Sequence, residues 1–182
     1  MNRFCLGVTK IQLRMYGLRF KALTVVKQPS GQEEEVAVFT KGAILGVTTV
    51  ANTIGVHELA FQSEKVLNYT IVHEAAHKKE LHGLLYWSFA VLSPLGLWFA
   101  LGWIGVPIAL MVWFFAVRWL IEFRADCQAT RTIGIRAVTE AHEEYLAIFK
   151  VSAFIRFVGL SVLHPPLSLT IGVCRLLHKD VH

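Results

Sequence analysis

A long stretch without charge constrains the fold of this chain most strongly. No Asp, Glu, Lys or Arg occurs in residues 83–117. As a single helix, this stretch would be roughly 52 Å long at 1.5 Å per residue, well beyond the hydrocarbon core of a bilayer, about 30 Å thick. The turn-rich segment 102–107 divides the stretch into two arms that each fit the bilayer. The sequence therefore predicts a transmembrane helical hairpin with arms at about 84–101 and 107–121.

The composition and the tryptophans agree with this hairpin. The chain is 54% hydrophobic and 17% charged, whereas soluble domains are about 45–50% apolar and about 25% charged. Two belts of tryptophan at two depths are typical of residues at membrane interfaces. The alternative is a buried hairpin in the core of a larger soluble assembly, because the arms are short for a span. The 5 tryptophans of the chain are Trp87 and Trp119 near the base, Trp98 and Trp103 near the tip, and Trp113 between them.

Basic residues flank the hairpin on one side only. Lys78 and Lys79 precede it, Arg118 and Arg124 lie at or after its exit, and its tip carries no charge. By the positive-inside rule, this asymmetry places the base of the hairpin in the cytoplasm. We interpret the net charge of +5 as attraction to an anionic lipid bilayer rather than to nucleic acid. The 3 scattered cysteines predict free thiols, with a packed thiol at Cys127, and a reducing compartment.

The first third of the chain is predicted to form a β-rich region. Residues 10–15 and 18–22 alternate between polar and apolar side chains, which indicates a β-hairpin. Two further strands are expected at Val36–Thr40 and Ala43–Val50, so that the region forms a small antiparallel sheet. Its first 41 residues include seven basic side chains. Either one face of the sheet rests on anionic headgroups, or these side chains form a solvated polar face.

The remainder of the chain is predicted to be helical. Ser63 caps a helix that runs to about His82, a second helix ends near Thr132, and a third covers about 137–162. Its second half, 148–163, is compatible with an interfacial helix, a core helix or a third span. The sequence thus predicts an α+β membrane protein with a β-rich region at 1–62 and a helical region at 63–182, into which the hairpin at about 84–121 is inserted.

The first predicted helix carries the sequence His73-Glu74-Ala75-Ala76-His77. Histidines four residues apart lie on one face of a helix, close enough to bind one metal ion. A glutamate that follows the first histidine can act as general base toward a metal-bound water. His57, His142, His178 and His182 are expected to be surface or capping residues.

A third metal ligand is expected from beyond the hairpin. Glu122 lies at its exit, and His73 and His77 lie just before its entrance. Because the hairpin goes out and returns, Glu122 is expected to come back to the depth of His77. Asp126 lies one helical turn after Glu122 on the same face, where it can accept a hydrogen bond from a ligand histidine.

These segments resemble the HtpX-like and CAAX-prenyl-protease-like integral-membrane zinc metalloproteases, the gluzincins. The resemblance covers about residues 36–170. It depends on the His-Glu-x-x-His helix, the hairpin, the motif Glu122-Phe123-Arg124-Ala125-Asp126 and the segment His164-Pro165-Pro166.

The resemblance implies one zinc ion per chain, held by His73, His77 and Glu122, with Glu74 as general base and acid. It also implies that Asp126 orients a ligand and that His164 steadies the oxyanion. The expected function is a membrane-bound zinc metalloendopeptidase that faces the cytoplasm. Its substrate would be a polypeptide, such as a misfolded membrane protein or a prenylated C-terminus, and a strand at Val36–Thr40 could pair with it. The alternatives are a non-catalytic metal-binding membrane adaptor, that is a pseudo-protease, and a membrane-surface module without metal. The oligomeric state is not predicted.

Overall fold

The computed structural model describes residues 3–42, 44–80, 88, 92, 95–148, 165 and 167–177. The chain divides into two compact units. One unit consists of Met1–Leu81 and Gln128–Val151, and the other of His82–Cys127 and Ser152–His182. The first contains a sheet with its covering helices, and the second contains the apolar helices.

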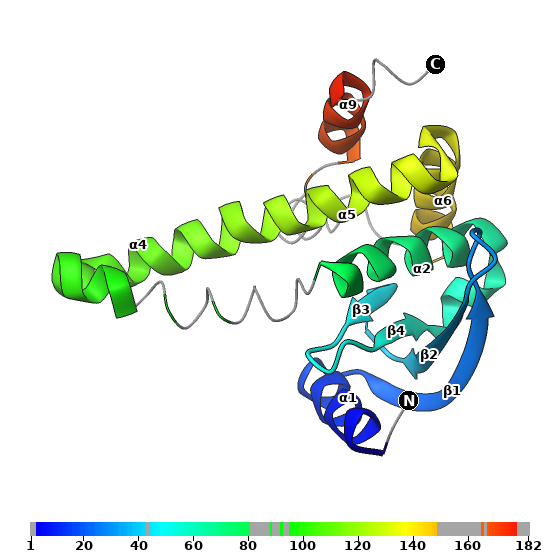
Figure 1. Ribbon diagram of the computed structural model, residues 1–182, viewed down its shortest axis with the longest axis horizontal. Helices are drawn as coiled ribbons and strands as arrows, with labels where there is room; N and C mark the ends of the chain where they lie inside the picture. Colours follow the sequence, from blue (N-terminus) through cyan, green and yellow to red (C-terminus); the bar gives the residue numbers. More distant parts are fainter. Residues whose placement is uncertain are drawn as a thin grey trace. The chain divides into compact units, whose positions relative to one another are not determined.

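The sheet of the first unit has four strands in the order β1-β2-β4-β3 (Figure 1). The chain leaves β2, forms β3 at the edge and returns as β4, which lies between β2 and β3. Consequently β4 is antiparallel to β3 but parallel to β2. The sheet is therefore mixed, and the prediction of a purely antiparallel sheet was wrong for this pair. The strands are β1 (Arg19–Lys27), β2 (Glu33–Thr40), β3 (Gly46–Thr48) and β4 (Ile54–His57).

The segment before β1 is helical. The helix α1 spans Arg3–Met15, so the β-hairpin predicted from the alternation in residues 10–15 was wrong. Thr9, Gln12 and Leu13 are buried, and their spacing is that of one helix face. Gln12 is polar, but its Oε1 accepts a hydrogen bond from the backbone N–H of Val50 at 2.8 Å. A buried glutamine satisfied by a distant backbone group is not visible in the local pattern.

Helices cover both faces of the sheet. On one face, Val36, Ile54 and Val56 form a core with residues of α2 (Glu64–Lys79) and α6 (Ile135–Ile148). On the other face, Ala37 and Phe39 pack with Leu13 of α1 and with Leu18. Because alternate residues of β2 point to opposite faces, α1 and α2 lie on opposite sides of the sheet, as Figure 1 shows.

The N-terminus of α2 agrees with the prediction. Ser63 is its N-cap, and its Oγ accepts a hydrogen bond from the backbone N–H of Val66 at 3.2 Å. The Ser63 hydroxyl also donates to Glu144 of α6, and Lys65 forms ion pairs of 3.0 Å with Glu140 and Glu144. These contacts tie the start of α2 to α6. The helix ends at Lys79, three residues before the predicted end near His82.

The second unit contains the predicted turn of the hairpin. Gly102 has φ +62° and begins the short helix η2 (Gly102–Ile104). A Cβ on Gly105 would lie 2.2 Å from the carbonyl oxygen of Leu97. Residues eight apart approach so closely only if the chain reverses, because one straight helix would separate them by about 12 Å. The helical chain then continues through α4 (Gly105–Val112), the π-helical turn Trp113–Val117 and α5 (Arg118–Ile133).

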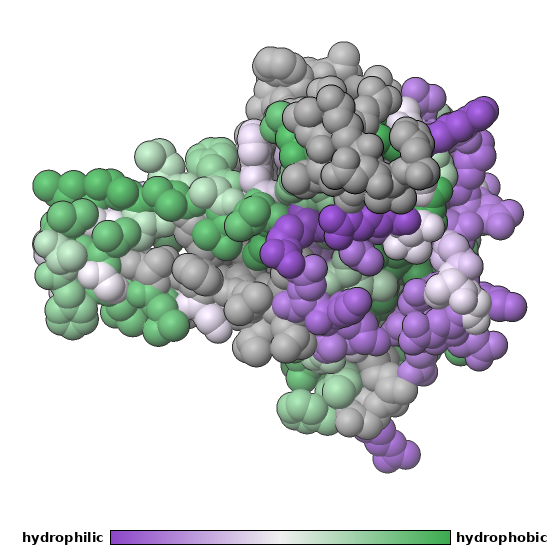
Figure 2. Space-filling view, turned by 45° about the horizontal axis from the view of Figure 1, so that its top comes forward, coloured by the Kyte–Doolittle hydropathy of each residue, from purple (hydrophilic) through white to green (hydrophobic). Residues whose placement is uncertain are grey.

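The helical stretch Leu95–Ile133 is long and apolar enough to cross a membrane, by length and composition alone. Only 12% of its most apolar window is buried, whereas a core helix of a soluble protein would be mostly buried. Figure 2 shows hydrophobic residues gathered over the end that carries α4. Trp87 and half of the first predicted arm, which was expected at about 84–101, lie outside the described residues. The most exposed apolar side chains in this region are Leu92, Phe99, Trp103, Ile104, Met111 and Leu120.

The second unit also contains a disulfide. Cys127 of α5 is bonded to Cys174 of α9 (Leu167–Leu177), and their Cα atoms are 5.6 Å apart. The prediction of a packed thiol at Cys127 was therefore wrong. The two cysteines are 47 residues apart, so only the fold brings them together. The third predicted helix is described as far as Ile148, and the rest of its second half, 149–163, lies outside the described residues.

Candidate metal centre

The helix α2 brings two imidazole rings together. His73 and His77 are four residues apart in the middle of this helix, and both side chains are buried. Their Nε2 atoms are 3.0 Å apart, and the ring centroids are 4.7 Å apart. Both rings therefore present a nitrogen to the same small volume.

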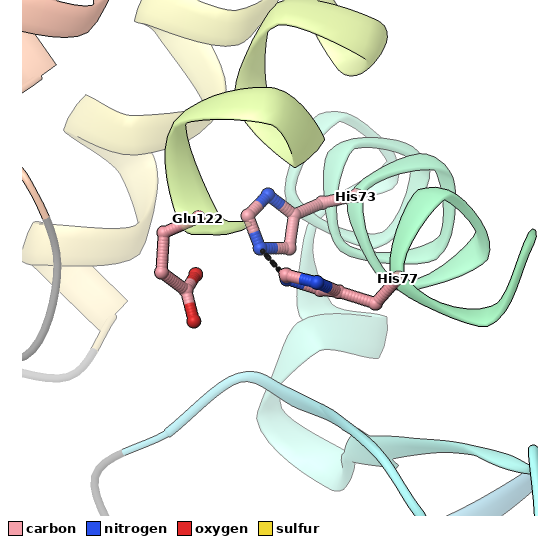
Figure 3. Close-up of side chains that lie close together, drawn as sticks. All are labelled: His73, His77 and Glu122. Carbon is pink, nitrogen blue, oxygen red and sulfur yellow. Dashed lines mark hydrogen bonds between the residues drawn. The ribbon is translucent and has the colours of Figure 1, made fainter. Parts of the chain in front are cut away.

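A carboxylate from α5 joins the two rings. One ligand atom from each of His73, His77 and Glu122 lies within 4.8 Å of the other two. Figure 3 shows the carboxylate of Glu122 directed toward the imidazoles of α2. The group could hold a metal ion, as the sequence predicts. Glu122 is 45 residues beyond His77, and α5 is a continuous helix that belongs to both compact units.

The donor set fits zinc. Two nitrogen ligands bound to one zinc ion at about 2.0–2.1 Å in tetrahedral geometry lie about 3.4 Å apart. The Nε2 atoms of His73 and His77, at 3.0 Å, are close to that separation without any ion. Two histidines and one carboxylate provide three protein ligands, which leaves the fourth position for water or substrate, as in catalytic zinc sites.

The carboxylate of Glu74 is held by the edge strand of the sheet. Its side chain is buried, and its Oε2 lies 2.8 Å from the hydroxyl oxygen of Thr48 in β3. The same hydroxyl lies 2.9 Å from the backbone carbonyl oxygen of Glu74. The single proton of Thr48 is thus shared between these two acceptors, and the contact fixes Glu74 against β3.

Gly46 allows this close approach. A Cβ at position 46 would lie 2.6 Å from Oε1 and 2.7 Å from Cγ of Glu74, and 2.8 Å from Cγ2 of Thr70. All three distances are shorter than an ordinary contact between non-bonded atoms, so α2 and β3 can pack in this way only with glycine here. Neither Gly46 nor Thr48 was predicted to belong to the site, because nothing in their spacing connects them with the His-Glu-x-x-His motif.

Two other predicted site residues have different outcomes. Asp126 is fully buried, one turn after Glu122 in α5, and its role in orienting a histidine stays a prediction. His164 lies outside the described residues, so its position relative to the metal ligands is not part of this structure.

His57 is a capping residue, as predicted, but it is buried rather than on the surface. Its Nδ1 accepts a hydrogen bond from the backbone N–H of Leu59 at 3.1 Å, which caps the short helix η1 (Glu58–Gln62). Its ring packs edge-on against Phe39, with centroids 5.3 Å apart. Burial lowers the pKa of His57 below 6.5, and the charge of Glu58 opposes this shift.

Comparisons with models of known families, with curated proteins and with solved structures give no match for this chain. The resemblance to the gluzincins therefore rests on the residues themselves. The geometry adds the proximity of the two histidines and the glutamate, and that proximity is the basis of the proposal below.

Proposed function

We propose that this protein is a membrane-bound zinc endopeptidase. The observation that carries the proposal is the convergence of His73, His77 and Glu122, with Glu74 on the same helix. A purely structural zinc site usually has four protein ligands, and it needs no acidic residue beside the first histidine. Three ligands and an adjacent carboxylate are the composition of a hydrolytic site.

The chain supplies a base and the means to position it. A bound zinc ion would polarise a water molecule and the peptide carbonyl. Glu74 would accept a proton from the attacking water and pass it to the leaving amine. The Thr48 hydroxyl, 2.8 Å from Oε2, limits the rotation of the carboxylate. Gly46 also packs against the same side chain, which restricts the space available to the base.

An extended substrate is expected along β3. Val36–Thr40 was the strand expected to pair with a substrate, but β2 is paired on both sides, with β1 and β4. That assignment was wrong, because an interior strand has no free edge for a peptide. Among the described residues, β3 pairs only with β4, and its Thr48 contacts the proposed base. A peptide added beside β3 would therefore run close to Glu74.

We place the base of the hairpin in the cytoplasm because basic residues flank it. The Cys127–Cys174 disulfide favours an oxidising compartment instead, and in a cytoplasmic protein the pair would be two adjacent thiols. Labelling of Ser30→Cys, an exposed position, with a membrane-impermeant maleimide in intact cells, in a Cys5→Ser background and without reductant, decides between these possibilities. Protection from the reagent supports the cytoplasmic assignment, and modification contradicts it.

The alternative function is a non-catalytic metal-binding adaptor. The observation in its favour is that Glu74 is buried and already accepts a hydrogen bond from Thr48, as a purely structural carboxylate would. The Glu74→Gln variant separates the two functions. It should abolish cleavage if the protein is an endopeptidase, whereas an adaptor cleaves neither as the wild type nor as the variant.

The deciding experiment measures bound zinc and cleavage of an unfolded protein substrate for the wild type and for Glu74→Gln. Both proteins should contain one zinc ion per chain, and only the wild type should cleave. Glu64→Gln is the matched control, because Glu64 lies on the same helix but is exposed, and this variant should cleave normally. Cleavage by Glu74→Gln would refute the role of the base. Zinc without cleavage in the wild type would favour the adaptor.

A further inference from the structure

The helix α1 has an outer surface that the metal centre does not use. One face of α1 is buried against the sheet through Thr9, Gln12 and Leu13. The hydrogen bond from Val50 to Gln12 and the packing of Leu13 with Phe39 hold this face in place. The outer surface of α1 is therefore fixed relative to the first unit.

An apolar stripe runs along this outer surface. Phe4, Ile11 and Met15 are 78%, 64% and 75% exposed. At 3.6 residues per turn, these three positions fall within about 40° of one another around the helix axis. Single exposed apolar residues are common on protein surfaces, but three aligned on a helix of 13 residues form a continuous strip.

A basic stripe lies beside the apolar one. Arg3, Lys10 and Arg14 are exposed, and they too fall within about 40° of one another, roughly 100° from the apolar stripe. The helix contains no acidic residue. The Nζ atom of Lys10 is 4.5 Å from the centroid of the Phe20 ring, so this ammonium group makes a cation–π contact at the edge of the basic stripe.

We propose that α1 is a binding surface for an anionic lipid bilayer. A helix with an apolar strip, an adjacent basic strip and no acidic residue lies in the plane of a membrane interface, with its apolar side in the acyl boundary. The basic side chains then contact anionic headgroups. This binding surface is independent of the metal centre. It lies on a helix, whereas the sequence pattern left open a contact between anionic headgroups and one face of the sheet.

Charge and area favour lipid over other occupants. A second copy of the chain would bring two basic stripes together. One face of a helix of this length also offers far less than the ~800 Å² per partner that stable protein interfaces bury. Nucleic acid would neutralise Arg3, Lys10 and Arg14, but it would leave Phe4, Ile11 and Met15 facing a charged backbone.

The test uses the full chain with an environment-sensitive fluorophore on Ile11→Cys in a Cys5→Ser background, labelled without reductant. The protein is reconstituted in nanodiscs of phosphatidylcholine alone or mixed equally with phosphatidylglycerol. In the anionic discs, we expect quenching by neutral acrylamide to fall severalfold and a nitroxide on the lipid acyl chain to quench the probe. A matched probe on Ser30→Cys, in the exposed turn between β1 and β2, should remain accessible to acrylamide in both discs.

The charge reversal Arg3→Glu with Arg14→Glu should restore acrylamide quenching at position 11 and leave the helical circular dichroism unchanged. The proposal is overturned if the probe at position 11 is as accessible as the probe at position 30 in anionic discs. Equal protection in neutral discs overturns the requirement for anionic lipid. Protection that appears in detergent and grows with protein concentration assigns the surface to a second copy, and protection by duplex DNA assigns it to nucleic acid. Each of these two outcomes also overturns the proposal.

Discussion

Gly46→Ala tests whether the position of Glu74 controls catalysis. The added methyl group would lie 2.6 Å from Oε1 of Glu74 and 2.8 Å from Cγ2 of Thr70. An ordinary contact needs about 3.5 Å, so the carboxylate must move by roughly 0.9 Å or β3 must separate from α2. A displacement of about 1 Å in a reacting group can reduce the rate about 100-fold.

The assay compares kcat, bound zinc and thermal unfolding of Gly46→Ala with those of the wild type. We expect kcat to fall about 100-fold and the zinc content to stay at one per chain, because neither His73 nor His77 is among the atoms nearest the added methyl group. Overpacking should also lower the free energy of unfolding by about 1–3 kcal/mol.

Gly55→Ala is the matched control for this loss of stability. Its Cβ would lie 2.9 Å from Cγ1 of Val47, so it overpacks the same sheet without touching Glu74. This variant should lose stability but keep its kcat. The reasoning is refuted if Gly46→Ala cleaves at the wild-type rate, or if Gly55→Ala loses as much activity as Gly46→Ala does.

Three further predictions concern hydrogen bonds and a buried histidine. Thr48→Val removes the hydroxyl that contacts Glu74. It should lower kcat about tenfold, since a hydrogen bond to a charged group is worth about 1.5–3 kcal/mol, with KM and zinc content unchanged in steady-state and metal assays. Because burial lowers the pKa of His57, the folded state favours the neutral imidazole. The stability that this residue contributes is complete above pH 6.5 and is lost as the pH falls through the pKa of His57 in the folded state. Between pH 7 and pH 5, the Tm of His57→Asn should therefore fall less steeply than the Tm of the wild type. The asparagine side chain keeps an acceptor for the cap. Ser63→Ala removes the N-cap of α2 and should cost about 1 kcal/mol, or about 2–4 °C in Tm by calorimetry, and an unchanged Tm would contradict this role.

The sequence predicted that His73, His77 and Glu122 lie close together, because the signals for this are local or follow from the path of the chain. The spacing of His73 and His77 is a property of one helix. Glu122 could be assigned because a helical hairpin returns to the depth from which it started. The Ser63 cap was predictable for the same reason, since an N-cap acts within its own first turn.

The misassigned parts depend on contacts between distant segments. The alternation in residues 10–15 fits a strand, but Gln12 is buried because it binds the backbone of Val50, 38 residues away. The parallel pairing of β2 with β4 and the Cys127–Cys174 disulfide likewise have no local signal. Gly46 and Thr48 belong to the same class, because their importance comes from packing against α2.

The zinc centre is the claim on which the catalytic account rests, and X-ray absorption at the zinc edge of the purified chain tests it most directly. The account predicts a shell of nitrogen and oxygen ligands at about 2.0–2.2 Å, with imidazole scattering from His73 and His77 and no sulfur. Glu122→Ala should lower the bound zinc. A sulfur shell at about 2.3 Å, or a chain that binds no zinc, would contradict the account.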